Sequence, residues 1–144
     1  MNNKGFGLVS VLAIFLVLTV LIASLMTLSK VQSLQVVNAT VEDQLELTAK
    51  NAIDMVAAAI IKTESEGDDV ALANMVPAAI DQSYNLDIDL NDDSHGTILD
   101  AKITRTVKNV AIISLTVSKG NIDYDLKGVM IRANFRWEFQ NYAK

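Results

Sequence analysis

The chain has 144 residues, 51% of them hydrophobic and 20% charged, and a formal net charge of −5 at pH 7. This length allows at most one compact soluble domain, and any membrane segment reduces the number of residues that remain for its core. The absence of cysteine excludes disulfides, thiolate catalysis and cysteine-ligated metals. All 17 acidic residues follow Ser29, and Lys4 is the single basic residue before it. The acidic remainder offers nucleic acid phosphates no general attraction, so we expect no direct nucleic acid binding.

The first thirty residues contain an uncharged run from Gly5 to Ser29, flanked by Lys4 and Lys30. Its 25 residues exceed the roughly 20 that a membrane-spanning helix needs. A secretory signal peptide has a shorter apolar core of about 7 to 15 residues, which disfavours that interpretation. A plain signal anchor, in which the run only tethers a domain, is the alternative.

The start of this run resembles the N-terminal segment of a type IV prepilin. Gly5 and Phe6 follow a short basic leader, and in that family a membrane peptidase cuts after such a Gly, before a Phe or Met that becomes methylated. The resemblance therefore implies a leader of residues 1–5, a cut between Gly5 and Phe6, and prepilin peptidase as a partner. A Gly before the cut also lets the peptidase approach the backbone, because it has no side chain.

The sequence departs from the family pattern at Ser10. Major pilins carry a Glu at the fifth mature residue, where its charge is relieved by pairing with the terminal amine of a neighbouring subunit. Ser10 occupies that position here and cannot form this ion pair. Its hydroxyl can instead bond back to its own helix. Family members without this Glu are typically minor subunits. The resemblance thus implies a minor, tip-proximal pilin or pseudopilin with assembly contacts at Leu8 and Ser10, and with other pilin or pseudopilin subunits and membrane lipid as partners.

An apolar stripe continues beyond Lys30 at helical spacing. Its members are Leu34, Val37, Val41, Leu45, Ala49, Ala52, Val56 and Ile60. The pattern predicts one helix from Phe6 to Lys62, roughly 85 Å long, with a membrane-spanning and assembly half (6–29) and an amphipathic half (30–66). Gly67 is predicted to end the helix in a left-handed conformation.

Residues 67–144 are predicted to form a small head domain. Pro77 is placed at the first turn of a short helical piece. Alternation predicts strands at Leu86–Leu90, Leu99–Val107 and Val110–Val117, with turns at 108–109 and 118–121. A final strand from Ile122 to Phe139 needs a bulge at Lys127–Gly128, which would place Phe135, Trp137 and Phe139 on the core face.

These elements predict an α+β, pilin-like fold. The second half of a long N-terminal helix would pack against an antiparallel meander of three or four strands. In this interpretation the chain is a single-pass protein of the cytoplasmic membrane with its C-terminal domain outside the cytoplasm, and later part of an envelope or surface fibre. The alternative is an unprocessed, membrane-anchored extracytoplasmic binding or sensor domain.

The residue types that carry chemistry are sparse, so we expect neither an enzyme nor a cofactor. Asp87, Asp89, Asn91 and Asp93 form a weak calcium option, and with it a secreted calcium-binding domain. That spacing has Asp92 where a calcium loop has Gly and Ile98 where it has Glu, which favours a solvated acidic loop. His95 is interpreted as an exposed loop residue, Arg132 and Arg136 as isolated surface charges, and Met55 and Met75 as packing residues.

Overall fold

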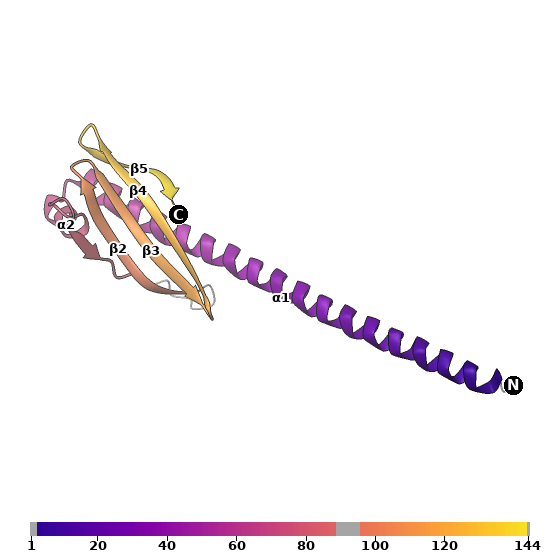
Figure 1. The fold of residues 1–144 in the computed structure, drawn as a ribbon. Helices are drawn as coiled ribbons and strands as arrows, with labels where there is room; N and C mark the ends of the chain where they lie inside the picture. Colours follow the sequence, from indigo (N-terminus) through magenta and orange to yellow (C-terminus); the bar gives the residue numbers. More distant parts are fainter. Residues whose placement is uncertain (1–2, 89–95, 144) are drawn as a thin grey trace. The chain divides into compact units, whose positions relative to one another are not determined.

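The structure, a computed structural model, describes residues 3–88 and 96–143 (Figure 1). Its elements in chain order are α1 (Asn3–Glu66), α2 (Asp69–Met75), β1 (Ser83–Asn85), β2 (Thr97–Val107), β3 (Val110–Lys119), β4 (Ile122–Ala133) and β5 (Arg136–Ala143). The strands form one antiparallel sheet in the order β1-β2-β3-β4-β5. The predicted α+β layout with a long N-terminal helix is therefore confirmed, with five strands instead of three or four. The chain divides into two compact units, one ending at Thr40 and one beginning at Val41.

In the second unit, α1 contributes a buried stripe to the core. The predicted positions Leu45, Ala49, Ala52, Val56 and Ile60 are all buried, and Ile53 and Ala57 join them. The sheet supplies the facing side chains Ala101, Ile103, Ala111, Ile113, Leu115, Val117, Leu126, Met130 and Trp137. The first two positions of the predicted stripe differ, because Leu34 and Val37 are 55% and 56% exposed. The buried part of the stripe thus begins near Val41, which packs against the core.

The end of α1 follows the sequence prediction. Gly67 has φ 75°, the left-handed conformation that a glycine adopts after a helix. Its N–H donates to Glu64 O at 3.1 Å, and the Asp68 N–H donates to Thr63 O at 3.4 Å. The Asp68 carboxylate then accepts from the Ala71 N–H at 2.9 Å and caps α2.

Pro77 lies after a helix and not at the start of one, so that prediction was wrong. Asp68 supplies the N-cap of α2, which ends at Met75, and Val76 adopts extended backbone before Pro77. The residue before a proline is disfavoured in helical conformation, which explains this order. Pro77 itself is buried.

The first strand is displaced from its predicted position, whereas β2 covers the predicted range Leu99–Val107 and begins earlier, at Thr97. The pairing strand β1 is Ser83–Asn85, with Tyr84 opposite Ile103, and not Leu86–Leu90; residues 89 and 90 lie outside the described residues. In β2, Leu99 and Val107 are 60% and 54% exposed. Register shifts between Ile98 and Asp100 and between Arg105 and Val107 interrupt the alternation at both ends of β2.

The predicted final strand is two strands joined by a two-residue turn. Asn134 and Phe135 have φ 50° and 64°, as the type I′ turn of a hairpin requires. Phe135 is 89% exposed at this turn, so its predicted place on the core face was wrong, whereas Trp137 is buried and Phe139 packs against the core.

The predicted bulge at Lys127–Gly128 was also wrong. The pairing of β3 with β4 runs without a shift from Val110 opposite Ile131 to Lys119 opposite Ile122. The buried face of β4 continues through Leu126, Gly128 and Met130, because Gly128 is itself a core-face position. The irregularity lies instead between Val129 and Met130, in the pairing with β5.

Candidate functional site

The residues singled out for processing and assembly lie near the start of α1. Gly5, Phe6, Leu8 and Ser10 belong to this helix, and the side chains of residues 3–10 lie outside what the structure describes. The cut between Gly5 and Phe6 and the contacts of Leu8 and Ser10 stay predictions.

The first unit presents an apolar helical surface. Within the residues that the structure describes, one helix is long and apolar enough to cross a membrane. An 18-residue stretch of it has a mean hydropathy of 2.8, and none of that stretch is buried inside the protein. The exposed apolar side chains between residues 11 and 28 are Val11, Leu12, Ile14, Phe15, Leu16, Val17, Leu18, Val20, Leu21, Ile22, Leu25, Met26 and Leu28. A weak indication of single-pass membrane anchoring follows.

The hydroxyl groups of this segment are satisfied within the helix. Thr19 donates to Phe15 O at 2.9 Å, Ser24 to Val20 O at 2.8 Å, and Thr27 to Ala23 O at 2.9 Å. Such bonds hide the polarity of a hydroxyl from an apolar surrounding. The segment can therefore face lipid or other apolar helices without unpaired hydroxyl donors at these three positions.

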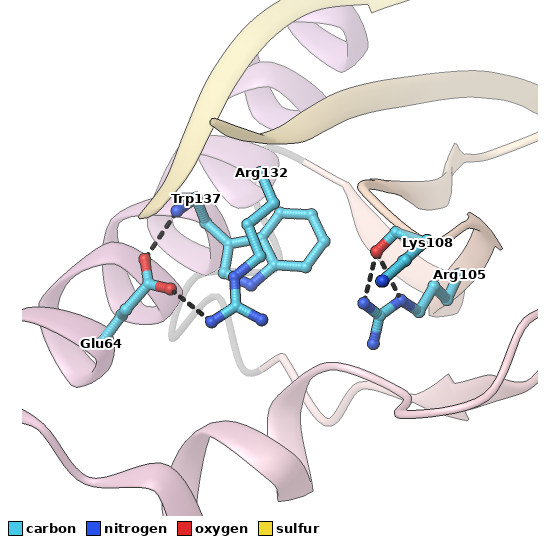
Figure 2. Close-up of polar contacts among 5 residues, drawn as sticks. All are labelled: Glu64, Arg105, Lys108, Arg132 and Trp137. Carbon is cyan, nitrogen blue, oxygen red and sulfur yellow. Dashed lines mark hydrogen bonds and ion pairs between the residues drawn. The ribbon is translucent and has the colours of Figure 1, made fainter. Parts of the chain in front are cut away.

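In the second unit, a carboxylate near the end of α1 holds the start of β5 (Figure 2). Glu64 accepts a hydrogen bond from the Trp137 N–H at 2.6 Å and from Arg132 Nη2 at 3.4 Å. The Glu64 side chain is 12% exposed and that of Arg132 is 35% exposed. Arg132 is thus part of a partly buried ion pair, which corrects its interpretation as an isolated surface charge.

Two guanidinium groups lie near the Trp137 ring. Arg105 and Arg132 each place their central carbon 5.9 Å from the ring centroid, within the range of a cation–π contact. Arg105 also donates to Pro77 O and Ala78 O at 3.1 Å each, and to Lys108 O (Figure 2). Arg105 therefore joins the segment after α2 to the β2–β3 hairpin, which is a structural role.

A groove runs beside the β4–β5 turn. It has a volume of about 520 Å³ and is lined by Ile61, Glu64, Ser65, Phe135, Arg136, Trp137, Glu138 and Phe139. We call it the tip groove. Its walls combine apolar groups with the exposed charges of Arg136 and Glu138.

The last strand has a second polar contact with α1. The Tyr142 hydroxyl donates to Asp54 Oδ1 at 2.6 Å, and Lys50 Nζ lies 5.5 Å from the Tyr142 ring centroid. Burial, this hydrogen bond and the negative charge of Asp54 raise the pKa of Tyr142 from 10.0 to about 12. Protonated Tyr142 therefore stabilises the docking of β5.

The calcium and methionine interpretations have different outcomes. Asp87 is exposed, and Asp89, Asn91, Asp93 and His95 lie outside the described residues, so the calcium option is untested there. Among residues 3–88 and 96–143, no three His, Asp or Glu side chains are grouped closely enough to hold a metal ion. Met75 packs against the core, whereas Met55 is 57% exposed and its assignment to packing was wrong.

Sequence reasoning missed Glu64, Asp54 and Tyr142 as positioning residues. Glu64 stands in the run Glu64–Asp69, which has the composition of a solvated helix end. Its one distinguishing signal is that it lies four residues after Ile60 and so near the buried stripe.

Comparisons with protein-family models, curated proteins and solved structures found no match.

Proposed function

We propose that this chain is a minor pilin or pseudopilin subunit that assembles through its N-terminal helix into a type IV pilus-like envelope fibre. One observation carries the proposal: a single helix, Asn3–Glu66, contains both an unburied apolar segment and the stripe that packs beneath a five-stranded antiparallel sheet. A pilin needs both parts in one helix, since the first must exchange lipid for neighbouring helices while the second anchors the folded domain.

The sequence at the start of α1 supports the same proposal. Gly5 and Phe6 follow a basic leader and precede the apolar segment. In the proposed mechanism the chain inserts once in the cytoplasmic membrane with its C-terminal domain outside the cytoplasm. Prepilin peptidase then cuts after Gly5, and residues 6–29 leave lipid to pack among the helices of other subunits. Apolar helices associate in lipid by close packing, so this exchange keeps apolar surface out of water.

Mass spectrometry of the membrane fraction tests the processing step. We expect a mature chain that begins with N-methylated Phe6, and a Gly5→Leu variant that keeps Met1 as a matched control. An intact Met1 in the unaltered chain would contradict the proposal and favour the unprocessed anchored domain.

The tip-proximal position rests on Ser10 and needs a separate test. A Ser10→Glu variant restores the carboxylate that would pair with the terminal amine of a neighbouring subunit. We expect it to appear along the length of the fibre in immunogold labelling, whereas the unaltered chain stays at the ends. A variant that still labels only the ends would show that the missing carboxylate does not determine the position.

A further inference from the structure

We propose that a cavity between α2 and the sheet binds a carboxylate group carried on a short apolar body. The cavity has a volume of about 210 Å³, and we call it the arginine cavity. It lies within the second unit, so the proposal does not rest on the proposed fibre function. Its lining residues are Asp69, Leu72, Ala73, Val76, Ala78, Arg105, Arg132 and Trp137.

Arg132 has hydrogen-bond donors that its ion pair does not use. Glu64 accepts from Nη2 at 3.4 Å, which is long compared with the 2.7 to 2.9 Å of a strong charge-assisted hydrogen bond. The Arg132 Nε is buried and has no hydrogen-bond partner within the residues that the structure describes. Figure 2 shows the other terminal nitrogen, Nη1, pointing away from Glu64. A guanidinium has five N–H donors, so Arg132 can bind a second carboxylate.

Arg105 adds a second positive charge to the wall of the cavity. Its side chain donates to Pro77 O and Ala78 O at 3.1 Å each, and to Lys108 O. Carbonyl groups satisfy these donors without neutralising the charge of the guanidinium. Asp69 is the one carboxylate among the lining residues, and it is exposed, so water screens its charge. The balance of charge favours an anion as the ligand.

The remaining wall is apolar. Leu72 and Val76 contribute buried side chains, Ala73 and Ala78 contribute methyl groups, and Trp137 contributes its ring. The cavity is smaller than the roughly 300 Å³ at which pockets for drug-sized ligands begin, so its ligand has few non-hydrogen atoms. A cation beside apolar surface suits a short aliphatic carboxylate, either as a free acid or as a glutamate side chain of another polypeptide.

The ligand-induced shift in urea unfolding measures this binding. A ligand that binds only the folded chain stabilises it, and the dependence on ligand concentration gives the dissociation constant. The full-length chain in detergent is titrated with propionate and, separately, with N-acetylglutamic acid amide, and unfolding is followed by Trp137 fluorescence. Propionamide, which has the same shape without the charge, is the control ligand, and sodium chloride keeps the ionic strength constant.

We expect both carboxylates to raise the urea midpoint and propionamide to leave it unchanged. The tighter of the two carboxylates identifies the source of the group. Arg132→Gln should raise the dissociation constant roughly tenfold or more. Asp69→Asn removes a like charge and should lower the dissociation constant, by up to about fivefold. Arg136→Gln is the matched control, because it removes the same charge from an exposed side chain that lines the tip groove instead.

A second variant tests the site if Arg132→Gln does not fold. Ala73 is exposed on α2 and lines the arginine cavity, so Ala73→Leu fills the cavity and should abolish the ligand-induced shift while the chain stays folded. No shift with either carboxylate, an equal shift with propionamide, or an unchanged dissociation constant in a folded Arg132→Gln or Ala73→Leu variant would overturn the proposal.

Discussion

Gly128 of β4 lies directly against Ile53 of α1. A Cβ at position 128 would overlap the Ile53 side chain and lie 3.0 Å from Phe139 Cε2. The absence of a side chain at this core-face position is therefore what lets the helix approach the sheet.

The Gly128→Ala variant should destabilise the second unit by about 1 to 3 kcal/mol, because the added methyl group overpacks the core. Urea unfolding of the full chain in detergent, followed by Trp137 fluorescence, measures this, since Trp137 is the one tryptophan and is buried. In an Ile53→Ala background, which itself costs about 2 to 5 kcal/mol, the same substitution should cost much less. Equal costs in both backgrounds would contradict the direct contact.

The sequence was informative where one residue type has one local consequence. Gly67 ends α1, and the alternation in Val110–Val117 marks β3 with its turns. Gly128 shows the limit of such reasoning. Without a side chain, Gly128 adds nothing apolar to the pattern, so a core-face position looked like a break in the alternation and led to a wrong bulge. The fact that decides between the two interpretations is the packing of Ile53, which is remote in the sequence.

The polar contacts of the candidate site could not be predicted for a related reason. Glu64 and Trp137 are 73 residues apart, and the hydrogen bond uses a backbone N–H, which every non-proline residue has. Phe135 was misplaced because its alternation with Trp137 continues through a turn. Two residues with positive φ reverse the chain there, and Asn followed by Phe is a weak turn signal compared with Asn-Gly.

Glu64 should be more important for stability than the other carboxylates at the end of α1. Glu64→Ala removes the acceptor of the Trp137 N–H and the partner of Arg132, so we expect a loss of about 2 to 3 kcal/mol. Glu64→Gln keeps an acceptor oxygen and should lose less. Glu66→Ala is the matched control, because the Lys62–Glu66 pair at 3.9 Å is exposed and should contribute less than about 0.5 kcal/mol. A similar loss of stability in Glu64→Ala and Glu66→Ala would contradict the role of Glu64 in holding the start of β5.

Tyr142 should make stability sensitive to alkaline pH. Its pKa is raised from 10.0 to about 12 in the folded chain, so its contribution is fully present below pH 10 and is lost as the pH rises toward 12. The Tyr142→Phe variant removes this contribution, and its stability should fall less than that of the unaltered chain across this range. Thermal melts at steps between about pH 9 and about pH 12 compare the two. Tyr84→Phe, which leaves the Asp54 contact intact, should keep the alkaline loss.

The apolar segment should tolerate charge poorly. Leu18 is 50% exposed within it, and an Arg near the centre of a membrane-spanning helix costs about 2.5 to 3.5 kcal/mol for insertion. Leu18→Arg together with Leu21→Arg should move the chain from the carbonate-resistant membrane fraction to the soluble or aggregated fraction. Leu47→Arg is the control, because Leu47 is 61% exposed in the same helix but outside the segment. Equal loss of membrane retention in all variants would contradict the assignment of residues 6–29 as the membrane-spanning segment.

Phe135 should be replaceable with a gain in stability. Glycine adopts a φ of 64° without the Cβ strain that phenylalanine has, and its greater unfolded-state entropy offsets part of that gain, so Phe135→Gly should stabilise the chain by about 0.5 to 1 kcal/mol. Asn134→Gly should change stability by less, since Asn tolerates this conformation. Urea unfolding followed by Trp137 fluorescence measures both. A destabilised Phe135→Gly variant would show instead that contacts of the ring with its own chain outweigh the backbone strain.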